Sequence, residues 1–339
     1  MSFGKNYDVV SSLPNAQELK EIAQLNLESV NTNRREICDI LSGRDSRFLY
    51  IVGPCSAWPS KAVLTFSEEL KVIQSRIQDS GKIVMRCYLQ KPRTTVGWKG
   101  PLFGDPGNKE ANLGKGVRES YKMMVDIINS TGLPLADEAL YQTSTAFQDL
   151  ISYLAIGART TESQPHRELA SSIDFAVGMK NPTSGKISRG VESVIAAQAK
   201  HDTIIRNGGG KLQHIRTYGN PNAHLILRGG DTGPNFEEEY IVQARRLLEK
   251  ANVSNPAIVV DCNHDNSDKN HNRQLEIARR VMEINKDSRN GGIVKGIMLE
   301  GFNLPGNQKP GEDMEMRGLS VTDPCSGIDE IRKLLFELN

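Results

Sequence analysis

Residues 48–53 read Phe-Leu-Tyr-Ile-Val-Gly, a short apolar run that is followed by Pro54 and Cys55. A run this short and this apolar is typical of a strand that is buried on both faces, as in a parallel sheet. Similar short runs occupy residues 83–88, 133–136, 154–157, 175–178, 225–227, 257–260 and 294–299. The sequence therefore predicts eight strands of one parallel sheet.

Most neighbouring runs are separated by a stretch with helical periodicity. These stretches are 60–79, 114–131, 143–151, 162–172, 187–204, 236–251 and 270–286. A helix that crosses back over the sheet would start each next parallel strand. Eight such units fit a closed (β/α)8 barrel, the TIM barrel, which takes about 250 residues. The alternative is a doubly wound open sheet, but neither of its usual glycine-rich phosphate motifs occurs in the chain.

The chain has 339 residues, more than the barrel needs. We expect a catalytic barrel over residues 48–339, an N-terminal helical extension over 1–47, and a small inserted hairpin at about 208–223, where Gly and Asn are frequent. The extension is suited to contacts between subunits, and a helix that only closes the bottom of the barrel is an equal alternative.

The composition is that of an ordinary soluble protein, with 38% hydrophobic and 24% charged residues. A formal net charge of +1 argues against electrostatic binding to nucleic acid or to an anionic membrane. No run approaches the 18 or so apolar residues of a membrane span, and the first residues do not resemble a secretory leader. Five scattered cysteines form no disulfide framework, so we expect a cytoplasmic protein.

Residues that follow the carboxyl ends of the strands face the active site of such a barrel. Six of them are cationic: Arg86, Lys91, Arg93, Arg159, Lys180 and Arg228. Any single one could be solvated or paired with an acid of a helix. Six together, in a chain with almost no net charge, predict a site for one or two phosphorylated substrates.

Cys55, His264, Glu300 and Asp323 also follow strands. A thiolate, an imidazole and two carboxylates suit one divalent ion such as Mn, Fe, Co or Zn. Each residue also has an ordinary structural interpretation, namely a packed thiol, a loop histidine, a solvated acid and a helix cap. Because the four positions are far apart in sequence, spacing alone does not decide between the two interpretations.

Several blocks of the chain resemble the type I 3-deoxy-D-arabino-heptulosonate 7-phosphate (DAHP) synthases, also named phospho-2-dehydro-3-deoxyheptonate aldolases. The most specific are Lys-Pro-Arg-Thr-Thr-Val-Gly-Trp-Lys-Gly at 91–100 and Gly-Ala-Arg-Thr-Thr-Glu-Ser-Gln at 157–164. Shorter blocks are Gly-Pro-Cys-Ser at 53–56, His-Arg-Glu-Leu-Ala-Ser at 166–171, Leu-Arg-Gly-Gly at 227–230 and Pro-Gly-Asn-Gln at 305–308. The resemblance runs from the first strand to Asp323.

This resemblance implies an aldol-like condensation of phosphoenolpyruvate with erythrose 4-phosphate and water, the first step of the shikimate pathway. It implies one divalent metal ion held by Cys55, His264, Glu300 and Asp323. It also implies that Arg86, Lys91, Arg159, Lys180 and Arg228, with Glu138 and the backbone of Ala158, hold phosphoenolpyruvate. By the same resemblance Arg93 and Thr94 hold the phosphate of the tetrose. Lys91 would move a proton to the new alkoxide, with a metal-bound water as competitor, and Cys55 and His264 complete the catalytic group as ligands.

The chain departs from the family pattern at residues 57–59 (Ala-Trp-Pro), 139–145 and 214–222, and at Asp174. The last three changes lie near the family's effector site, so inhibition by an aromatic amino acid stays open. The first lies near the metal, so a different aldehyde substrate stays open as well. Two further alternatives are a Schiff-base aldolase that uses Lys91 or Lys180 and a non-catalytic barrel that binds a phosphorylated metabolite. The resemblance also suggests a homodimer or homotetramer.

Overall fold

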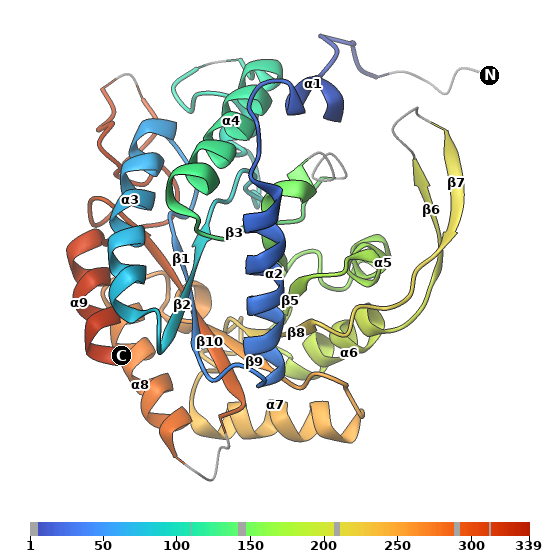
Figure 1. Cartoon of the computed structure of the whole chain (residues 1–339), viewed down its shortest axis with the longest axis vertical. Helices are drawn as coiled ribbons and strands as arrows, with labels where there is room; N and C mark the ends of the chain where they lie inside the picture. Colours follow the sequence, from blue (N-terminus) through green and yellow to red (C-terminus); the bar gives the residue numbers. More distant parts are fainter. Residues whose placement is uncertain (1–5, 109, 142–146, 207–210, 288–291, 312) are drawn as a thin grey trace.

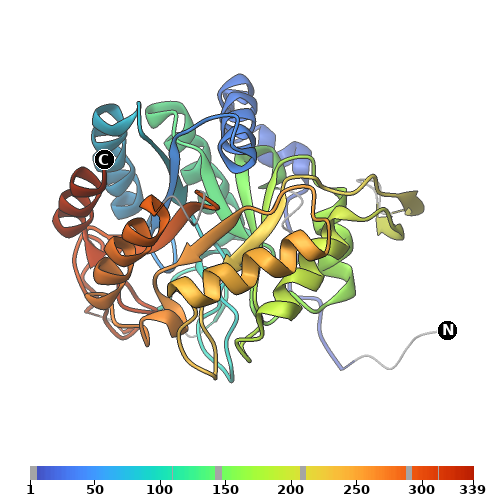
Figure 2. The ribbon, with the colours of Figure 1, turned by 90° about the horizontal axis from the view of Figure 1, so that it is seen from below.

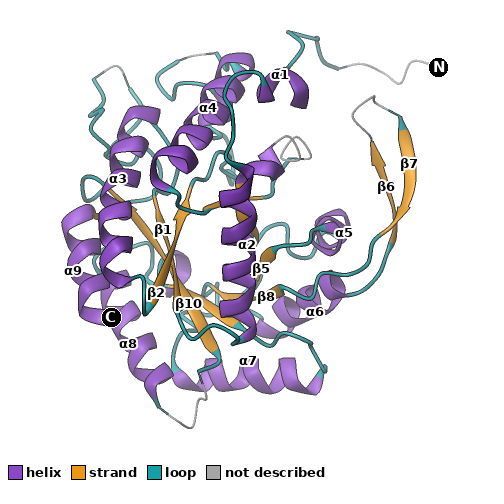
Figure 3. Cartoon of the chain, viewed as in Figure 1, coloured by secondary structure: helices purple, strands orange, loops and turns teal. Residues whose placement is uncertain are grey.

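In the computed structural model, which describes residues 6–108, 110–141, 147–206, 211–287, 292–311 and 313–339, eight parallel strands form a ring. Hydrogen bonds between the first and last of them close the ring, so the (β/α)8 barrel prediction is confirmed (Figures 1 and 3). In ring order these strands are β1 (Phe48–Gly53), β2 (Gly81–Arg86), β3 (Leu135–Glu138), β4 (Ile151–Ile156), β5 (Ala176–Lys180), β8 (Ala223–Leu227), β9 (Ile258–Asp261) and β10 (Val294–Phe302).

Helices lie around the outside of the strand ring (Figure 2). Their apolar faces and the outward side chains of the strands form one continuous hydrophobic layer, as the helical periodicity predicts. The helices that follow the strands are α3 (Ser60–Ile77), α4 (Leu113–Thr131), α5 (Gln164–Ser172), α6 (Ile187–Gln198), α7 (Glu238–Lys250), α8 (Arg273–Lys286) and α9 (Ile328–Leu338). None of the helices that the structure describes is long and apolar enough to cross a membrane.

A second hydrophobic cluster fills the inside of the barrel. Alternate strand residues, among them Leu49, Ile51 and Val84, belong to it, because side chains two positions apart share one face of a strand. The N-terminal extension contains the short helix α1 (Ala16–Lys20) and the longer helix α2 (Leu27–Ser42). Ile37, Ile40 and Leu41 of α2 join the same interior cluster, so α2 covers this end of the barrel, as one of the two interpretations predicts (Figure 1).

The inserted hairpin consists of β6 (Asp202–Arg206) and β7 (Leu212–Arg216), which pair antiparallel and project from the barrel beside α5 and α6 (Figure 1). It begins earlier than the predicted range 208–223, which overlaps only its second strand; residues 208–210 lie outside the described residues. The helix predicted over 187–204 is wrong in its last turn and a half. α6 ends at Gln198. The residues of β6 are mostly exposed and do not alternate between buried and exposed, so hydropathy alone does not predict this strand.

Other predicted boundaries are wrong where polar residues belong to a strand. β3 runs to Glu138 rather than ending at Ala136, because the charged side chains of Asp137 and Glu138 are buried. It starts after Pro134, which has no N–H to donate. β4 begins at Ile151, the last residue of the helix predicted over 143–151. Residues 147–150 of that range form a 3-10 turn, and 143–146 lie outside the described residues.

The last helix, α9, was absent from the predicted set, although Ile331, Leu334 and Leu335 have the spacing of one buried helical face. α9 packs against α3 and α8 and completes the outer layer beside β1 and β10. The short strand β11 (Ser326–Gly327), which continues from the β10 loop, leads directly into it.

Candidate functional site

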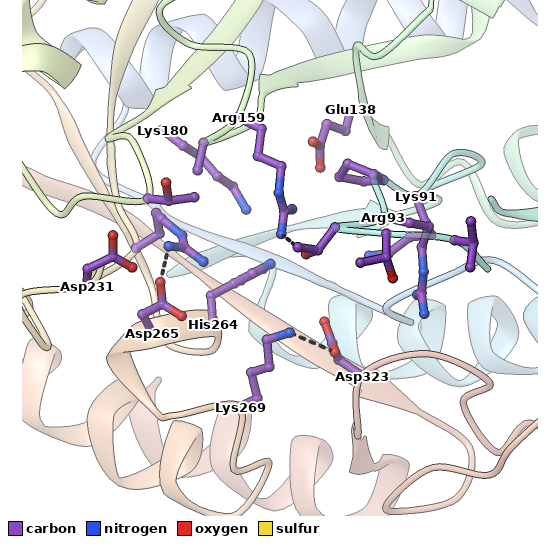
Figure 4. Close-up of a pocket in the computed structure, with 18 residues that line it drawn as sticks. Lys91, Arg93, Glu138, Arg159, Lys180, Asp231, His264, Asp265, Lys269 and Asp323 are labelled. Carbon is purple, nitrogen blue, oxygen red and sulfur yellow. Dashed lines mark hydrogen bonds and ion pairs between the residues drawn. The ribbon is translucent and has the colours of Figure 1, made fainter. Parts of the chain in front are cut away.

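A cavity of about 560 Å³ lies at the carboxyl ends of the barrel strands, and we call it the mouth cavity (Figure 4). Its walls come from the segments that follow β2, β3, β4, β5, β8, β9 and β10. The predicted site residues that line it are Lys91, Arg93, Thr94, Glu138, Ala158, Arg159, Lys180, Arg228, His264 and Asp323.

Strand periodicity explains why charged side chains gather here. Val259 and Met298 belong to the apolar interior cluster, and Asp261 and Glu300 follow them by two positions on the same strands. Residues two apart share a face, so the interior of the barrel is apolar below and charged at the mouth. Gly157 leaves room for this arrangement, because a Cβ there would lie 2.1 Å from Glu138 Oε1.

Four of the predicted cations that line the mouth cavity contact other groups of the protein. Lys180 Nζ lies 2.9 Å from the buried carboxylate of Asp261, and Arg228 forms an ion pair with Asp265. Arg159 Nη2 donates to Thr94 Oγ1 at 3.1 Å, which joins the loops after β4 and β2. Lys91 Nζ donates to the backbone carbonyl of Cys55 at 2.9 Å. In Figure 4, Lys180, Arg159 and His264 point from three different segments into one space.

Arg86 does not line the mouth cavity. Its guanidinium is fully buried beneath it, where Nη2 lies 2.9 Å from Glu300 Oε1 and the group stacks 3.9 Å from the centroid of the Tyr88 ring. The structure therefore separates Arg86 from the other five predicted cations. Its contact in this structure is with Glu300, one of the predicted metal ligands.

Lys91 is buried in the wall of the mouth cavity, with 9% of the residue exposed. Burial by itself would lower its pKa, but the neighbouring acidic groups, Cys55, Glu300 and Asp323, hold it above the usual lysine value. The ammonium is therefore protonated at neutral pH and can donate a proton to an oxyanion that forms beside it.

Three of the four predicted metal ligands converge. One ligand atom each from Cys55, Glu300 and Asp323 lies within 4.8 Å of the others. Cys55 Sγ accepts the backbone N–H of Asp323 at 3.4 Å and lies 3.7 Å from its Oδ2. One thiol sulfur and two carboxylates are donors that a borderline divalent ion accepts, so this donor set fits the predicted metal.

His264 is not part of that close group but lines the same cavity. Its Nδ1 lies 2.8 Å from Asp261 Oδ2. A carboxylate at one ring nitrogen leaves the other, Nε2, as the atom available to a ligand, which is the usual arrangement of a metal-binding histidine. Burial would raise the pKa of Asp261, but His264 and Lys180 hold it well below its usual range.

The electrostatics of the sulfur and the neighbouring acid differ. Burial raises the pKa of the Cys55 thiol to about 11, and Glu300 adds to this effect. Burial acts in the same direction on Asp323, but Lys91, Lys269 and His264 outweigh it and lower the pKa of that carboxyl. Asp323 is therefore a carboxylate at neutral pH and can bind a cation directly, whereas the Cys55 thiol loses its proton only when a metal cation replaces that proton.

Sequence reasoning missed Asp261, Asp265 and Lys269, whose side chains contact Lys180, Arg228 and Asp323. It also missed Asn263, whose Nδ2 donates to Glu300 Oε2 at 2.5 Å. A signal was present, because residues 261–266 read Asp-Cys-Asn-His-Asp-Asn directly after an apolar strand. Such a polar run at a strand's carboxyl end is typical of a barrel's active-site loop.

The departure at residues 57–59 places an aromatic residue near the site without reaching the cavity. Trp58 is 8% exposed, and its ring centroid lies 6.3 Å from that of Trp98 in an edge-on contact. Trp98 belongs to the loop that carries Arg93 and Thr94, and its Nε1 donates to Gly104 O at 2.8 Å. Trp58 thus packs against the loop after β2 and does not line the mouth cavity.

A second cavity, of about 760 Å³, lies between α5, the start of β4 and the β6–β7 hairpin, and we call it the side cavity. Much of its lining is apolar, including Leu154, Leu169, Phe175, Ile204 and Ile215. Glu168 is its main fixed acid, held by hydrogen bonds from Gln164 and Thr203. Part of the departing region 139–145 borders this cavity, and residues 142–145 of it lie outside the described residues.

A model of the DAHP synthetase I family matches residues 19–335. The chain belongs to that family. A "Phospho-2-dehydro-3-deoxyheptonate aldolase, tyrosine-inhibited" of Schizosaccharomyces pombe is 39% identical over 94% of this chain and 86% of its own length. A Tyr-sensitive enzyme of that name from Escherichia coli is 38% identical over 95% of this chain and 91% of its own.

The fold of this family member also matches a solved structure. The phospho-2-dehydro-3-deoxyheptonate aldolase of Francisella tularensis superposes with a TM-score of 0.92 at 36% identity, covering 98% of this chain and 97% of the other. A Trp-sensitive relative from Enterobacter agglomerans is 41% identical over 91% of this chain and 88% of its own length. The family resemblance that the sequence blocks predict is therefore confirmed.

Proposed function

We propose that this chain is a DAHP synthase, which condenses phosphoenolpyruvate with erythrose 4-phosphate and water to give DAHP and phosphate. The observation that carries the proposal is the mouth cavity, where cations from several strands surround a space beside a thiol and two carboxylates. Membership of the DAHP synthetase I family supports the same reaction. The step opens the shikimate pathway to the aromatic amino acids.

The two substrates carry two phosphates and a carboxylate, and these anionic groups need the cations of the mouth cavity as partners. Lys180, Arg228 and Arg159, with Glu138 and the backbone of Ala158, bind the phosphoenolpyruvate anion in this proposal. Arg93 and Thr94 bind the phosphate of the tetrose. The contact between Arg159 and Thr94 supports adjacent subsites, because it ties the two binding loops together. Arginine forks match the paired oxygens of phosphate and carboxylate.

Arg86 acts from below. Its ion pair with Glu300 holds one predicted metal ligand in place and supplies positive charge under the substrate. Cys55, His264, Glu300 and Asp323 hold the divalent ion, and the donor types favour Mn, Fe, Co or Zn. When bound, such an ion supplies a Lewis acid for the aldehyde oxygen.

The bonds change as follows. C3 of phosphoenolpyruvate bonds to the aldehyde carbon of the tetrose, and C2 becomes electron-poor. Water adds to C2 and loses one proton, and the new C2 hydroxyl loses the second as C2–O breaks and phosphate leaves with its bridging oxygen, which gives the 2-keto group. One of these two protons leaves with the phosphate, and the other restores the proton that Lys91 gives up. Lys91 gives a proton to the oxygen of the former aldehyde. A protonated Lys91 can give this proton but cannot act as a base, which supports the role of an acid.

The test is phosphate release from phosphoenolpyruvate, measured with a panel of aldose phosphates, with added Mn and with excess EDTA. We expect release only with both substrates present, a preference for erythrose 4-phosphate, and loss of activity in EDTA. Full activity in EDTA would contradict the proposed metal dependence. Phosphate release that does not depend on erythrose 4-phosphate would show that the enzyme uses a different aldehyde substrate. Borohydride trapping of a substrate on Lys91 or Lys180 would replace the reaction by a Schiff-base mechanism.

The proposal includes inhibition by an aromatic amino acid in the side cavity. Relatives of this chain are named tyrosine-inhibited, Tyr-sensitive and Trp-sensitive. The apolar lining fits an aromatic ring, and the Glu168 carboxylate fits an ammonium group. Titration of the three aromatic amino acids into the assay identifies the effector, and no inhibition by any of them would contradict this part.

We also infer a cytoplasmic dimer or tetramer. Buried free thiols at Cys55 and Cys325 support a reducing compartment. Exposed apolar side chains on the extension (Val9 and Val10) and on the hairpin (Ile204 and Leu212) support contacts with further copies of the chain. Sedimentation at several concentrations measures the subunit count, and a monomer at all of them would contradict the assembly.

A further inference from the structure

The ion pair between Arg228 and Asp265 faces the mouth cavity, and both residues line it. Arg228 follows β8, whereas Asp265 lies in the short helix η3 (His264–Asn266) after β9. Their exposures differ greatly, since 7% of the Arg228 side chain is accessible against 34% of the Asp265 side chain. The arginine is enclosed by the protein, and the carboxylate is the partner that can turn toward water.

Backbone packing holds the two segments together without the ion pair. Asn266 Nδ2 donates to the carbonyls of Leu227 and Asp261, at 3.3 and 2.8 Å, and its Oδ1 accepts the N–H of Asn235 at 2.7 Å. A Cβ on Gly229 would lie 2.6 Å from the Asn266 nitrogen, so only glycine permits this approach. The backbone beside Arg228 is therefore held in place by contacts that do not involve Asp265.

The guanidinium also has unused capacity for hydrogen bonds. Arg228 Nε is buried and has no hydrogen-bond partner among the residues that the structure describes. The guanidinium offers five N–H groups, and its contact with Asp265 is made by Nη1. An anion that enters the cavity must share Arg228 with the carboxylate or displace it, and a like charge beside a bound anion lowers its affinity.

Asp261 provides the contrast. Its carboxylate is 1% exposed and contacts both Lys180 and His264, so it cannot leave when an anion binds. Among the residues that the structure describes, the Asp265 side chain pairs with Arg228 alone, and it has access to solvent. The two acids therefore have different consequences for anion binding, although both neutralise a cation of the same cavity.

We propose that Asp265 is a resident counter-ion that competes with the anionic group of the substrate for Arg228, and thereby weakens the binding of phosphoenolpyruvate. The inference rests on the proposed function, because that proposal gives Arg228 to phosphoenolpyruvate. Asp265 is thus a residue that sets affinity, not one that takes part in the bond changes.

The experiment measures binding of inorganic phosphate and of phosphoenolpyruvate to EDTA-treated protein by calorimetry, for wild type and Asp265→Asn. Asparagine keeps the size of the side chain and removes its charge. We expect both dissociation constants to fall about two- to fivefold, which is the range of one partly exposed charge interaction. With Mn added, we expect the KM for phosphoenolpyruvate to fall by a similar factor and kcat to change less than about twofold.

Three further variants serve as controls. Asp231→Asn removes a carboxylate that lines the same cavity but forms no ion pair with Arg228, and we expect a change of less than about twofold. Asp265→Glu keeps the charge and should bind phosphate as the wild type does. Asp265→Ala replaces Asp265→Asn if the latter does not fold, which thermal unfolding shows.

The outcomes separate the two proposals. If wild type binds phosphate and phosphoenolpyruvate but Asp265→Asn binds them equally or more weakly, this inference is wrong and Asp265 orients Arg228 instead. An equal gain in Asp231→Asn would also overturn it, because the effect would then be general to the cavity. If wild type binds neither anion, the proposed function fails and the inference fails with it.

Discussion

The mouth cavity and the side cavity lie on one barrel but are built from different parts of it. The mouth cavity is lined by residues that end or follow strands, and its charged groups are tied to one another across strands, as Lys180 is to Asp261. The side cavity is lined by α5, the hairpin and the start of β4, and apolar side chains such as Leu169 and Phe175 dominate it. The strand ends hold charged side chains in the positions that a reaction needs. Helix α5 and the β6–β7 hairpin provide an apolar surface, which can differ between relatives without disturbing the reaction.

The largest effect should come from the mouth cavity. Replacement of Lys91 by methionine removes the ammonium to which we assign the proton transfer to the new oxyanion, and we expect kcat to fall by about 10² to 10⁴. Steady-state kinetics measure this. Lys99→Met is the matched control, because Lys99 is exposed in the same loop and does not line the cavity. A Lys91 variant with near wild-type kcat would give the proton transfer to another group.

The second prediction concerns the apolar interior beneath the mouth cavity and how the stability of the protein depends on pH. His224 is buried there, its Nε2 lies 2.7 Å from the Tyr153 hydroxyl, and burial lowers its pKa to about 4. The unfolded chain, with a histidine pKa near 6.5, binds the proton more readily than the native state. This contribution to stability is therefore complete above about pH 6.5 and is lost toward pH 4, up to about 3 kcal/mol.

Urea unfolding at pH 7 and at pH 4.5 measures that loss. We expect the difference in free energy of unfolding between the two pH values to be smaller in His224→Gln than in wild type. His214→Gln is the control, because His214 lies on the exposed hairpin beside Asp202. If His224→Gln and wild type lose the same free energy of unfolding, His224 does not carry this dependence.

The smallest effect should come from filling the side cavity. Ser172 lies at the end of α5 and lines this cavity, so tryptophan there should occupy the space of an effector. We expect the inhibition constant of the aromatic effector to rise at least about tenfold, or 1.4 kcal/mol, with kcat nearly unchanged. Ser75→Trp is the control, since Ser75 is also exposed and donates to the carbonyl three residues before it, as Ser172 does. Inhibition that survives Ser172→Trp would move the effector to another surface.

How much the sequence predicts differs between the two cavities for a physical reason. Arg159, Lys180 and Arg228 could be assigned to the mouth cavity because parallel strands in a barrel all end on one side. The side cavity depends on where the hairpin folds back, and the exposed strand Asp202–Arg206 carries no clear alternation of buried and exposed residues. Hydropathy therefore could not predict where the hairpin starts, and without the hairpin the residues that line the side cavity could not be predicted.

Pairing within the mouth cavity was also beyond the sequence. The six cations look alike in the chain, but Arg86 is buried against Glu300, whereas Arg93 is exposed at the cavity. A carboxylate neutralises a cation only within a few ångströms, and that distance depends on how segments remote in sequence pack.

The sequence by itself determined the barrel and the side of it on which chemistry occurs, because period-two and period-3.6 patterns and strand direction are local properties of the chain. It also determined the family, because the chain contains several sequence blocks that resemble those of the DAHP synthases. Only the tertiary structure decided that Asp265 neutralises Arg228, that Asp261 serves Lys180 and His264, and that Cys55 meets Asp323. Those contacts arise from closure of the strand ring and from the packing of its loops, which no single segment encodes.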